Sequence, residues 1–390
     1  MRTHLDIKHT GNIDGTRTKM TFDENSVAHL MSVLTDLYSD RALAVIREYA
    51  TNALDSHRRA GVNKPIHVSR PSQLHPFYRV EDFGEGMSRD QIENEFSKYG
   101  FSTNRDTDET TGMLGLGCKA GLSYSSQFTV ESVKNGRRTM AVVTREEDGA
   151  GAIQIVAEEE TTDPNGTVIE VPVNASGYFN EKLDWFFAFW DSADVLIDGQ
   201  RPTTLWDKGD EDDITKLVAG RLNDAPKGTT VKLDEDILLT TQPNFGGIRF
   251  VMGGVAYMLG LDHYPQLHGN ADESPFGDWL RRQRYSKYRD GGIGVVVRVP
   301  IGTVDFVPSR EELSYTKRTR EVINTFFEFM NEHMLKILQF KIDACETCHA
   351  AAELANMLNN RLNANYFKKY RGMTIPFKIN FDQVHEPTLD

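Results

Sequence analysis

The stretch REYATNALDSHRRAG, residues 47–61, is the most informative segment of this 390-residue chain. It predicts a helix that is closed by Gly61, because glycine readily adopts the left-handed conformation that ends many helices. At about 100° per residue, Glu48, Asn52 and Asp55 lie on one stripe of that helix. The opposite side of the same helix is apolar, with Leu43, Ile46, Ala50, Ala53 and Leu54. A polar stripe of this kind is usually a solvated face, and the alternative is the polar wall of a site.

The composition predicts a packed globular protein without a broad nucleic-acid surface. Hydrophobic residues make up 39% of the chain, and the formal net charge is −13. An acidic balance repels nucleic acid, although a local basic groove within an acidic total stays compatible with these numbers. No run reaches the roughly 18 apolar residues of a membrane span, and the first residues contain no signal-peptide core. We therefore expect a cytoplasmic protein, with peripheral membrane association at most.

The three cysteines of the chain fit a reducing compartment. Cys345, Cys348 and His349 form a CxxCH pattern, which is typical of covalent haem attachment. That attachment is expected outside the cytosol, and the sequence has no second CxxC pair to complete a tetrahedral zinc site. We therefore expect two ordinary cysteines on a helix.

The predicted elements are helices first and then a run of strands. Helices are expected at 25–38, 40–60 and from Ser88 to about Tyr99, and short strands at 66–69 and 77–82. The helix at Ser88 begins with a capping-box pattern. Asn135-Gly136 and Asp163-Pro-Asn-Gly166 mark turns between later strands. This order predicts an α+β fold, with helices on one face of a mostly antiparallel sheet.

The chain divides into three predicted parts, residues 1–200, 201–317 and 318–390. A helix at about 178–190 and a strand near 195–197 close the first part. The polar, charged stretch RPTTLWDKGDEDD, residues 201–213, marks the boundary. The second part is an α/β unit with strands around 248–258 and 293–307, and the last part is helical, with apolar residues three and four apart.

Two glycine-rich segments follow the first helices. Asp82-Phe-Gly-Glu-Gly-Met87 ends a predicted strand, so a carboxylate lies beside backbone that a flat ligand can approach closely. The alternative there is a plain turn with a capping acid. Gly112-Met-Leu-Gly-Leu-Gly-Cys-Lys119 follows the polar loop 101–111, and glycines before a helix can cradle phosphates with main-chain N–H groups.

Three better-known motifs resemble these segments, but the residues in or around each segment exclude them. The second segment is not a Walker A loop, because Cys118 and Ala120 stand where lysine and Ser/Thr are required. It also follows a polar loop, whereas a dinucleotide fold requires a strand there. Asp82-Phe-Gly has no upstream H-R-D loop of the kind that protein kinases carry.

Four motifs in fixed order carry a resemblance to a known superfamily. They are E-x-x-x-N-A-x-D from Glu48, D-x-G-x-G-M from Asp82, G-x-x-G-x-G from Gly112, and Gly166-Thr167 in a strand. This order resembles the GHKL ATPases, such as gyrase B, the ninety-kilodalton heat-shock chaperone, MutL and histidine kinases. The stretches LYSDRALAVIREYATNALDSH, VEDFGEGMS, GMLGLGCKAGLSY and VPSREELSY are similar to the rIIA lysis-inhibition proteins of tailed phages.

The resemblance implies a Bergerat-type α/β sandwich that binds ATP, then an S5-like transducer domain and C-terminal helices. By resemblance, Glu48 is the general base for the attacking water, and Asn52 is the Mg²⁺ ligand. Asp55 belongs to the same motif and is expected at the nucleotide. Asp82 accepts a hydrogen bond from the adenine amino group, which disfavours the carbonyl of guanine, and Thr167 supports Asp82.

The glycine segments complete the expected nucleotide site. By the same resemblance, Gly84, Gly86 and Met87 line the adenine pocket. A lid of residues 100–114 covers the phosphates together with its glycine loop, which comprises Gly112, Leu114, Gly115, Leu116 and Gly117. Lys119 adds positive charge at the phosphates in the functional interpretation, and it faces solvent in the alternative.

Arg310, in the segment PSREELS, resembles the middle-domain arginine of the chaperone branch, which reaches the γ-phosphate. In that role it stabilises charge in the transition state and couples ATP to the second domain. The alternative is a surface salt bridge with Glu311 or Glu312. We favour the first role, because the apolar strand TVDFVP before Arg310 fixes its position.

These implications predict a conformational switch that binds ATP with Mg²⁺, hydrolyses ATP slowly and forms a homodimer when the lid closes. By resemblance, its biological role is in phage lysis inhibition or exclusion, with a host or phage protein as partner. The rival functions are a DNA clamp of the MutL or gyrase class, a chaperone, and a scaffold that binds ATP without turnover. DNA is the less expected partner, because the chain is acidic.

Overall fold

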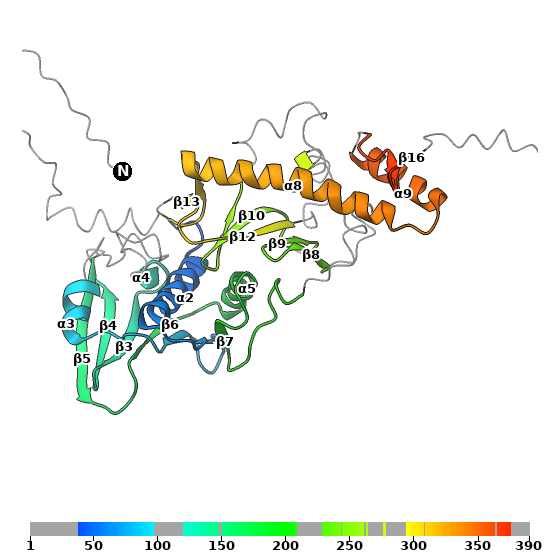
Figure 1. Ribbon diagram of the computed structural model, residues 1–390. Helices are drawn as coiled ribbons and strands as arrows, with labels where there is room; N and C mark the ends of the chain where they lie inside the picture. The colour runs from blue at the N-terminus through cyan, green and yellow to red at the C-terminus, as the bar shows by residue number, and fades with distance from the viewer. Residues whose placement is uncertain are drawn as a thin grey trace, which may run out of the picture.

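Figure 1 shows the computed structural model of the chain. The structure describes residues 38–96, 120–147, 150–208, 228–242, 244–260, 263, 276–277, 294–307, 309–362 and 365–375. Apart from Tyr38, the helix predicted at 25–38 lies outside these residues, and so does the predicted lid at 100–114.

The first sheet has seven strands in the order β5-β4-β3-β6-β2-β1-β7. They are β1 (Ile66–Ser69), β2 (Phe77–Asp82), β3 (Gln127–Lys134), β4 (Arg137–Arg145), β5 (Gly151–Glu160), β6 (Gly166–Pro172) and β7 (Val195–Ile197). Neighbouring strands are antiparallel, except that β1 and β7 are parallel. Asn135 and Gly136 both have positive φ, 52° and 77°, as a tight hairpin turn requires.

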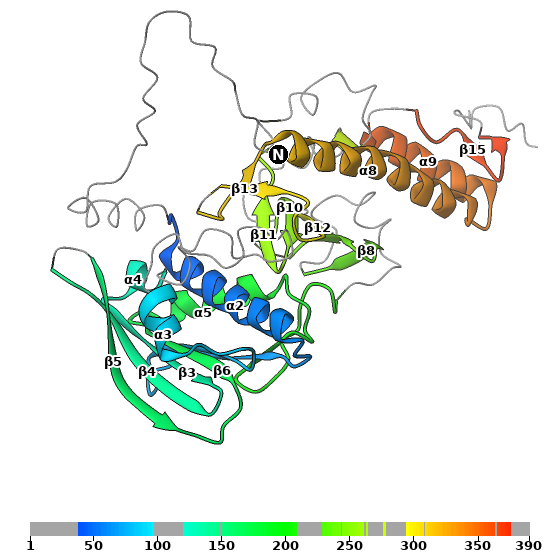
Figure 2. The same cartoon turned by 60° about the vertical axis from the view of Figure 1, so that its left-hand side comes forward.

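Helix α2 (Arg41–Ala60) is the central element of the fold. Asp40 caps its first turn by accepting the N–H of Leu43, and Gly61 closes it with φ 64°. Two further helices, α4 (Ala120–Tyr124) and α5 (Ser176–Phe187), lie with it on one face of the seven-stranded sheet (Figures 1 and 2). The predicted α+β class and this arrangement of helices on one face are confirmed.

The capping box at Ser88 is also confirmed. The Ser88 hydroxyl accepts the N–H of Gln91, and the Gln91 side chain accepts the N–H of Ser88. The helical turn α3 (Arg89–Gln91) continues into a π-helical turn, η2 (Ile92–Phe96), which buries Ile92 and Phe96.

The second sheet has five strands in the order β11-β10-β12-β9-β8. They are β8 (Thr230–Asp234), β9 (Ile237–Thr240), β10 (Gly247–Met252), β11 (Val255–Met258) and β12 (Gly294–Val299). β10 and β12 are parallel, and the other neighbours are antiparallel. The sequence prediction places no strand at β8 or β9, so it is incomplete there. A small pair, β13 (Asp305–Phe306) and β14 (Leu313–Ser314), follows this sheet.

Two helices and a short hairpin form the C-terminal part, as predicted for a helical tail. α8 (Lys317–Asp343) crosses the second sheet on the side away from α2 (Figures 1 and 2). Phe326 of α8 packs against Phe250 of β10, with ring centroids 5.4 Å apart. α9 (Cys348–Leu362), β15 (Lys369–Tyr370) and β16 (Met373–Thr374) complete this part.

The cysteine prediction is wrong for one residue. Cys345 lies in the turn between α8 and α9, and Cys348 is the first residue of α9. Among the described residues, no cluster of His, Cys, Asp and Glu side chains is suited to a metal ion. In the same part of the chain, none of the helices combines the length and the apolar character that a bilayer-spanning segment requires.

Both views place α2 between the two sheets (Figures 1 and 2). One cluster of buried apolar side chains extends from the first sheet through α2 and α5 to the second sheet and α8, and includes Val130, Tyr49, Phe186, Phe250 and Phe326. The polar stripe of α2 is therefore enclosed. Glu48 is 3% exposed and Asp55 is 1% exposed, so the solvated-face interpretation is wrong for these two residues.

Candidate functional site

Glu48 lies in the first half of α2 with its carboxylate between two guanidinium groups. Its Oε2 accepts a hydrogen bond from Arg310 Nη1 at 3.0 Å, and its Oε1 accepts one from Arg47 Nε at 3.2 Å. All three side chains are buried. A buried carboxylate is stable only when it is paired and hydrogen-bonded, so the two arginines make this position tenable.

Arg310 follows the second sheet and reaches α2 from 262 residues away. It is only 4% exposed, so the surface salt bridge with Glu311 or Glu312 is wrong. Its φ is 57°, a left-handed conformation that is uncommon for a residue with a side chain. Its Nε and Nη2 have no hydrogen-bond partner among the described residues. Burial alone lowers the pKa of Arg310, but attractions led by Glu48 outweigh it and leave the pKa above its ordinary value.

The segment around Arg310 is held to the start of α2 by its neighbours. Arg47 Nη2 donates to Ser309 O at 2.7 Å. The Glu311 carboxylate accepts the N–H groups of Ser39, at 3.0 Å, and Asp40, at 3.4 Å. A carboxylate at a helix N-terminus also complements the helix dipole. These contacts link the second sheet to the helix that carries Glu48.

Asn52 lies one turn after Glu48 on α2 and is half-buried. Its side chain forms no hydrogen bond to another residue that the structure describes, so its amide oxygen is free to act as a ligand for a hard cation. Asp55, one turn further, accepts a hydrogen bond from Arg58 Nη1 at 2.9 Å.

Asp82 ends β2 and is 8% exposed. Its Oδ1 accepts hydrogen bonds from Ser56 Oγ at 3.0 Å and from the N–H of Gly84 at 2.9 Å. Burial raises the pKa of Asp82 to about 6, and the contacts with Gly84 and Ser56 oppose that rise. The carboxylate is therefore ionised at neutral pH and protonates in mild acid.

Thr167 of β6 lies directly opposite Asp82 in the sheet. Its main chain helps to hold down the pKa of Asp82. Its hydroxyl is 2.9 Å from Ser132 Oγ, which also accepts the N–H of Met87 at 2.7 Å. Ser132 therefore joins Thr167 to the residue that follows the glycine turn.

The two glycines after Asp82 are needed because the turn passes very close to other backbone. A Cβ at Gly84 would lie 2.1 Å from Ser56 Oγ and 2.7 Å from the Ser56 carbonyl carbon. A Cβ at Gly86, whose φ is 64°, would lie 1.9 Å from the carbonyl oxygen of Val133. Any side chain at these positions would push the turn away from α2 or from β3.

The structure thus brings part of the predicted set together. α2 carries Glu48, Asn52 and Asp55, the end of β2 carries Asp82, and Arg310 reaches the same helix from the connection between β13 and β14. The remaining predicted phosphate contacts lie outside the described residues, namely Gly112, Leu114, Gly115, Leu116, Gly117 and Lys119.

Four residues that hold this region together are absent from the sequence prediction: Arg47, Ser56, Ser132 and His57, whose Nε2 accepts the N–H of Phe83. Ser56 follows Asn52 by four residues, so helical spacing already places it on the polar stripe. Arg47 directly precedes Glu48, and its position follows no helical spacing that would have marked it as a site residue. Ser132 lies on another strand, and only the sheet register brings it to Met87 and Thr167.

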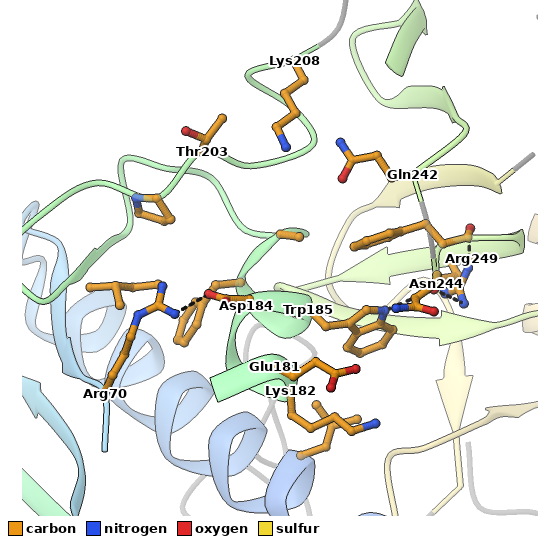
Figure 3. Close-up of a pocket in the computed structure, with 16 residues that line it drawn as sticks. Arg70, Glu181, Lys182, Asp184, Trp185, Thr203, Lys208, Gln242, Asn244 and Arg249 are labelled. Atoms are coloured by element: carbon orange, nitrogen blue, oxygen red, sulfur yellow. Dashed lines mark hydrogen bonds and ion pairs between the residues drawn. The ribbon is translucent and has the colours of Figure 1, made fainter. Parts of the chain in front are cut away.

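A separate pocket of about 680 Å³ lies where α5 meets the second sheet (Figure 3). Figure 3 shows Trp185 at its centre, Lys208 and Gln242 above it, and Arg70 paired with Asp184 at one side. None of the 16 lining residues belongs to the predicted nucleotide set. This pocket is therefore distinct from the region around Glu48 and Asp82.

The comparisons with known proteins support the ATPase prediction for the first part of the chain. Residues 41–171 match the protein-family model described as "Histidine kinase-, DNA gyrase B-, and HSP90-like ATPase". This match supports a GHKL-type ATPase domain from α2 to β6, and it includes Glu48, Asn52, Asp55, Asp82 and Thr167. Arg310 lies outside it. No curated protein matches the chain.

Solved structures of one enzyme region are similar to this chain at low identity. The ATPase region of Saccharomyces cerevisiae topoisomerase II is 14% identical with a TM-score of 0.48, and the match covers 75% of this chain and 84% of that one. The same region bound to ICRF-187 (dexrazoxane) is 14% identical with a TM-score of 0.47, covering 76% and 85%.

Proposed function

We propose that this chain is a GHKL-type conformational switch that binds ATP with Mg²⁺ and hydrolyses ATP slowly. The observation that carries the proposal is the shared use of α2. Its C-terminal half fixes Asp82 through Ser56, and its N-terminal half carries Glu48, paired with Arg310. About 12 Å of helix separates Glu48 from Ser56. A nucleotide along α2 would have its base at one acid and its phosphates at the other.

Asp82 provides the specificity for adenine. An ionised carboxylate accepts hydrogen bonds and donates none, so it suits the adenine amino group and repels the carbonyl of guanine. Gly84 and Gly86 keep the adjoining backbone close to α2 and β3, and Met87 adds an apolar side chain beside them. Thr167 and Ser132 support this corner from the sheet.

Glu48 is the proposed general base, and Asn52 is the residue that would hold Mg²⁺. The ion would screen phosphate charge when bound, and the free amide oxygen of Asn52 fits it. Glu48 takes a proton from water only when a water molecule reaches its carboxylate, which is 3% exposed and in contact with Arg47 and Arg310. Arg310 must therefore release Glu48 before hydrolysis.

The switch is an exchange of partners by Arg310. Its Nε and Nη2 already lack partners among the described residues, and a phosphate offers oxygens in a geometry that suits a guanidinium fork. Moving from Glu48 to the γ-phosphate frees the base and pulls the segment 309–311, hence the second sheet, relative to α2. ATP and ADP then favour different positions of the two sheets.

The remaining assignments are part of the same proposal. They are an ATPase domain at 1–200, an S5-like transducer at 201–317, a helical segment at 318–390, a phosphate lid that includes Lys119, and a homodimer on ATP binding. The role in phage lysis inhibition or exclusion rests on the four rIIA-like stretches, and it implies a protein partner in the host cytoplasm. DNA-stimulated hydrolysis would instead support the clamp alternative.

A nucleotide titration tests this proposal directly. Isothermal calorimetry of the chain at pH 7.5 with Mg²⁺ is expected to show ATP binding at least tenfold tighter than GTP binding, because guanine places a second acceptor at Asp82. A phosphate-release assay is expected to show slow turnover of the bound ATP. Equal affinity for ATP and GTP, or no binding of either, would contradict the proposal.

A further inference from the structure

His57 is a buried histidine beside the proposed adenine site, and its two ring nitrogens make different hydrogen bonds. It is 1% exposed and lies near the end of α2. Its Nδ1 lies 2.9 Å from the carbonyl oxygen of Lys64, and its Nε2 accepts the N–H of Phe83 at 2.7 Å. A carbonyl accepts and an N–H donates, so both contacts are satisfied only in the neutral ring with the hydrogen on Nδ1.

Phe83 is the residue between Asp82 and Gly84, so His57 holds the middle of the proposed adenine turn. Ser56, its neighbour on α2, donates to Asp82 and accepts the N–H of Glu85 at 3.3 Å. Two consecutive residues of one helix therefore contact Asp82, Phe83 and Glu85 of the turn. Ser56 contacts the acid itself, whereas His57 fixes the backbone that carries it.

We propose that His57 is a positioning residue for adenine binding, and that its neutral Nδ1–H form holds the turn while its protonation releases the turn. The inference rests on the proposed function of this corner. In the protonated ring, Nε2 carries a hydrogen that would face the N–H of Phe83, and two donors cannot share that contact. Phe83 then has to move, and Asp82 and Gly84 move with it.

The charged groups around His57 favour the neutral ring. Burial lowers the pKa of His57, and the charges of His67 and Lys64 lower it further, against the hydrogen bond to Lys64 O. His67 is on β1 and lies 3.9 Å from Glu81. Lys64 is in the turn after α2. From the β2 turn, Asp82 adjoins Phe83 in the sequence, and Glu85 is paired with Arg59. Neutral His57, and with it nucleotide affinity, is therefore expected above the lowered pKa and lost as the pH falls through it.

The first test is the tautomer itself. Imidazole nitrogen shifts of ¹⁵N-labelled protein at pH 7.5, with His57 assigned by its loss in His57→Gln, are expected to show hydrogen on Nδ1 and a bare Nε2. Addition of ATP should preserve that tautomer. An Nε2–H ring or a doubly protonated ring at this pH would overturn the inference. A histidine that only filled space would not need one tautomer.

The second test separates His57 from Asp82 by the pH dependence of ATP affinity. A pKa of about 6 for Asp82 predicts a loss of about fourfold between pH 7.5 and 5.5. The parent should lose more than that once the pH falls through the lowered pKa of His57, so the titration is extended downward until the His57→Gln and parent curves separate or the protein unfolds. His57→Gln keeps an acceptor for the Phe83 N–H but does not titrate, so it should stay within about threefold of the parent at pH 7.5 and lose only about fourfold. Titration of the nucleotide is common to both proteins and cancels.

Two further variants complete the test of His57. His57→Leu removes the acceptor and is expected to weaken ATP binding about tenfold at pH 7.5. His75→Gln, at an exposed histidine before β2, is the matched control and should behave like the parent. Identical pH dependence in the parent and His57→Gln overturns the inference while leaving the proposed function intact. A parent that binds no ATP at pH 7.5 overturns both.

Discussion

The two ends of α2 are held in opposite ways. At the C-terminal end, Ser56 and His57 contact a turn that lies 26 residues away in the same sheet layer, through neutral donors and acceptors and one carboxylate. At the N-terminal end, Glu48 is held by the charges of Arg47 and of Arg310, which comes from beyond the second sheet. At the first end, Ser56 and His57 both form hydrogen bonds to the turn, whereas at the second end two nitrogens of Arg310, Nε and Nη2, have no hydrogen-bond partner among the described residues.

This difference suggests that the two ends of α2 have different roles. A turn held by short hydrogen bonds inside one layer is built before the nucleotide arrives, so it can select the base without reorganisation. A carboxylate held by an arginine from another layer can exchange its partner when a stronger anion appears. In the proposed function, the C-terminal end of α2 with Ser56 and His57, here the fixed end, would recognise the base, and the N-terminal end with Glu48, here the exchangeable end, would couple the layers.

The largest effect is expected from substitution of Glu48, the acid at the exchangeable end of α2. Glu48→Ala should lower kcat by about 10²- to 10⁴-fold with ATP affinity nearly unchanged, because it removes the general base. It also leaves Arg47 and Arg310 without their buried partner, which typically costs about 3–5 kcal/mol of stability. Glu48→Gln, which keeps an acceptor, separates the two effects. Phosphate release and thermal melting measure them, and parental turnover in the glutamine variant would remove Glu48 from its role.

Substitution at the fixed end of α2 should change the affinity for ATP rather than the rate of hydrolysis. Asp82→Asn is expected to weaken ATP binding about 100-fold by calorimetry, because a charged acceptor is lost and an amide donor can face the adenine amino group. Its melting temperature should not fall, since the buried carboxylate, whose pKa is raised, is itself costly at neutral pH. Glu85→Gln, an acid-to-amide change in the same turn, is the control and should bind normally. Equal affinity in the parent and Asp82→Asn would contradict the assignment.

Removing the cross-layer partner should have a smaller effect. Arg310→Ala is expected to slow hydrolysis at least tenfold, about the value of one charge-assisted hydrogen bond, while ATP binding changes little. Arg318→Ala, at a more exposed arginine paired with Asp305, serves as control. If single-turnover assays show that Arg310→Ala hydrolyses ATP as fast as the control variant, the exchange of partners is wrong.

A lower pH should reduce ATP affinity a few-fold, and only through the fixed end of α2. Protonation of Asp82 is expected to reduce ATP affinity about fourfold from pH 7.5 to pH 5.5, because its pKa is about 6. In the Asp82→Asn variant this part of the pH dependence should vanish, leaving that of His57. Calorimetric titrations across this range would reveal the change, and a pH-independent parent affinity would speak against an ionised Asp82 at the base.

Sequence reasoning succeeds here where structure is locally determined. The Gly61 helix end, the Ser88 capping box and the Asn135-Gly136 turn depend on a few neighbouring residues, and all three are confirmed. The β8–β9 hairpin turns at Glu235 and Asp236 without glycine, so it carried no turn signal. The boundaries of α5 are shifted by a few residues, from the predicted 178–190 to Ser176–Phe187.

The long-range contacts of the site could not be predicted. Periodicity shows that Glu48 and Asp55 share a stripe, but it does not reveal that both residues are buried in the fold. The resemblance singled out Arg310 and a phosphate as its target, whereas the structure pairs Arg310 with Glu48. Ser132 reaches Thr167 only through the register of β3 and β6. The roles at Glu48, Asn52, Asp82 and Arg310 stay predictions until nucleotide is bound.

The central claim is that ATP lies along α2 and takes Arg310 from Glu48. A crystal structure with Mg²⁺ and a non-hydrolysable ATP analogue tests it most directly. The account predicts the adenine amino group within hydrogen-bond distance of Asp82, and Arg310 on the γ-phosphate with Glu48 released. A nucleotide in the pocket of Figure 3, or a Glu48–Arg310 pair that persists beside the bound triphosphate, would contradict it.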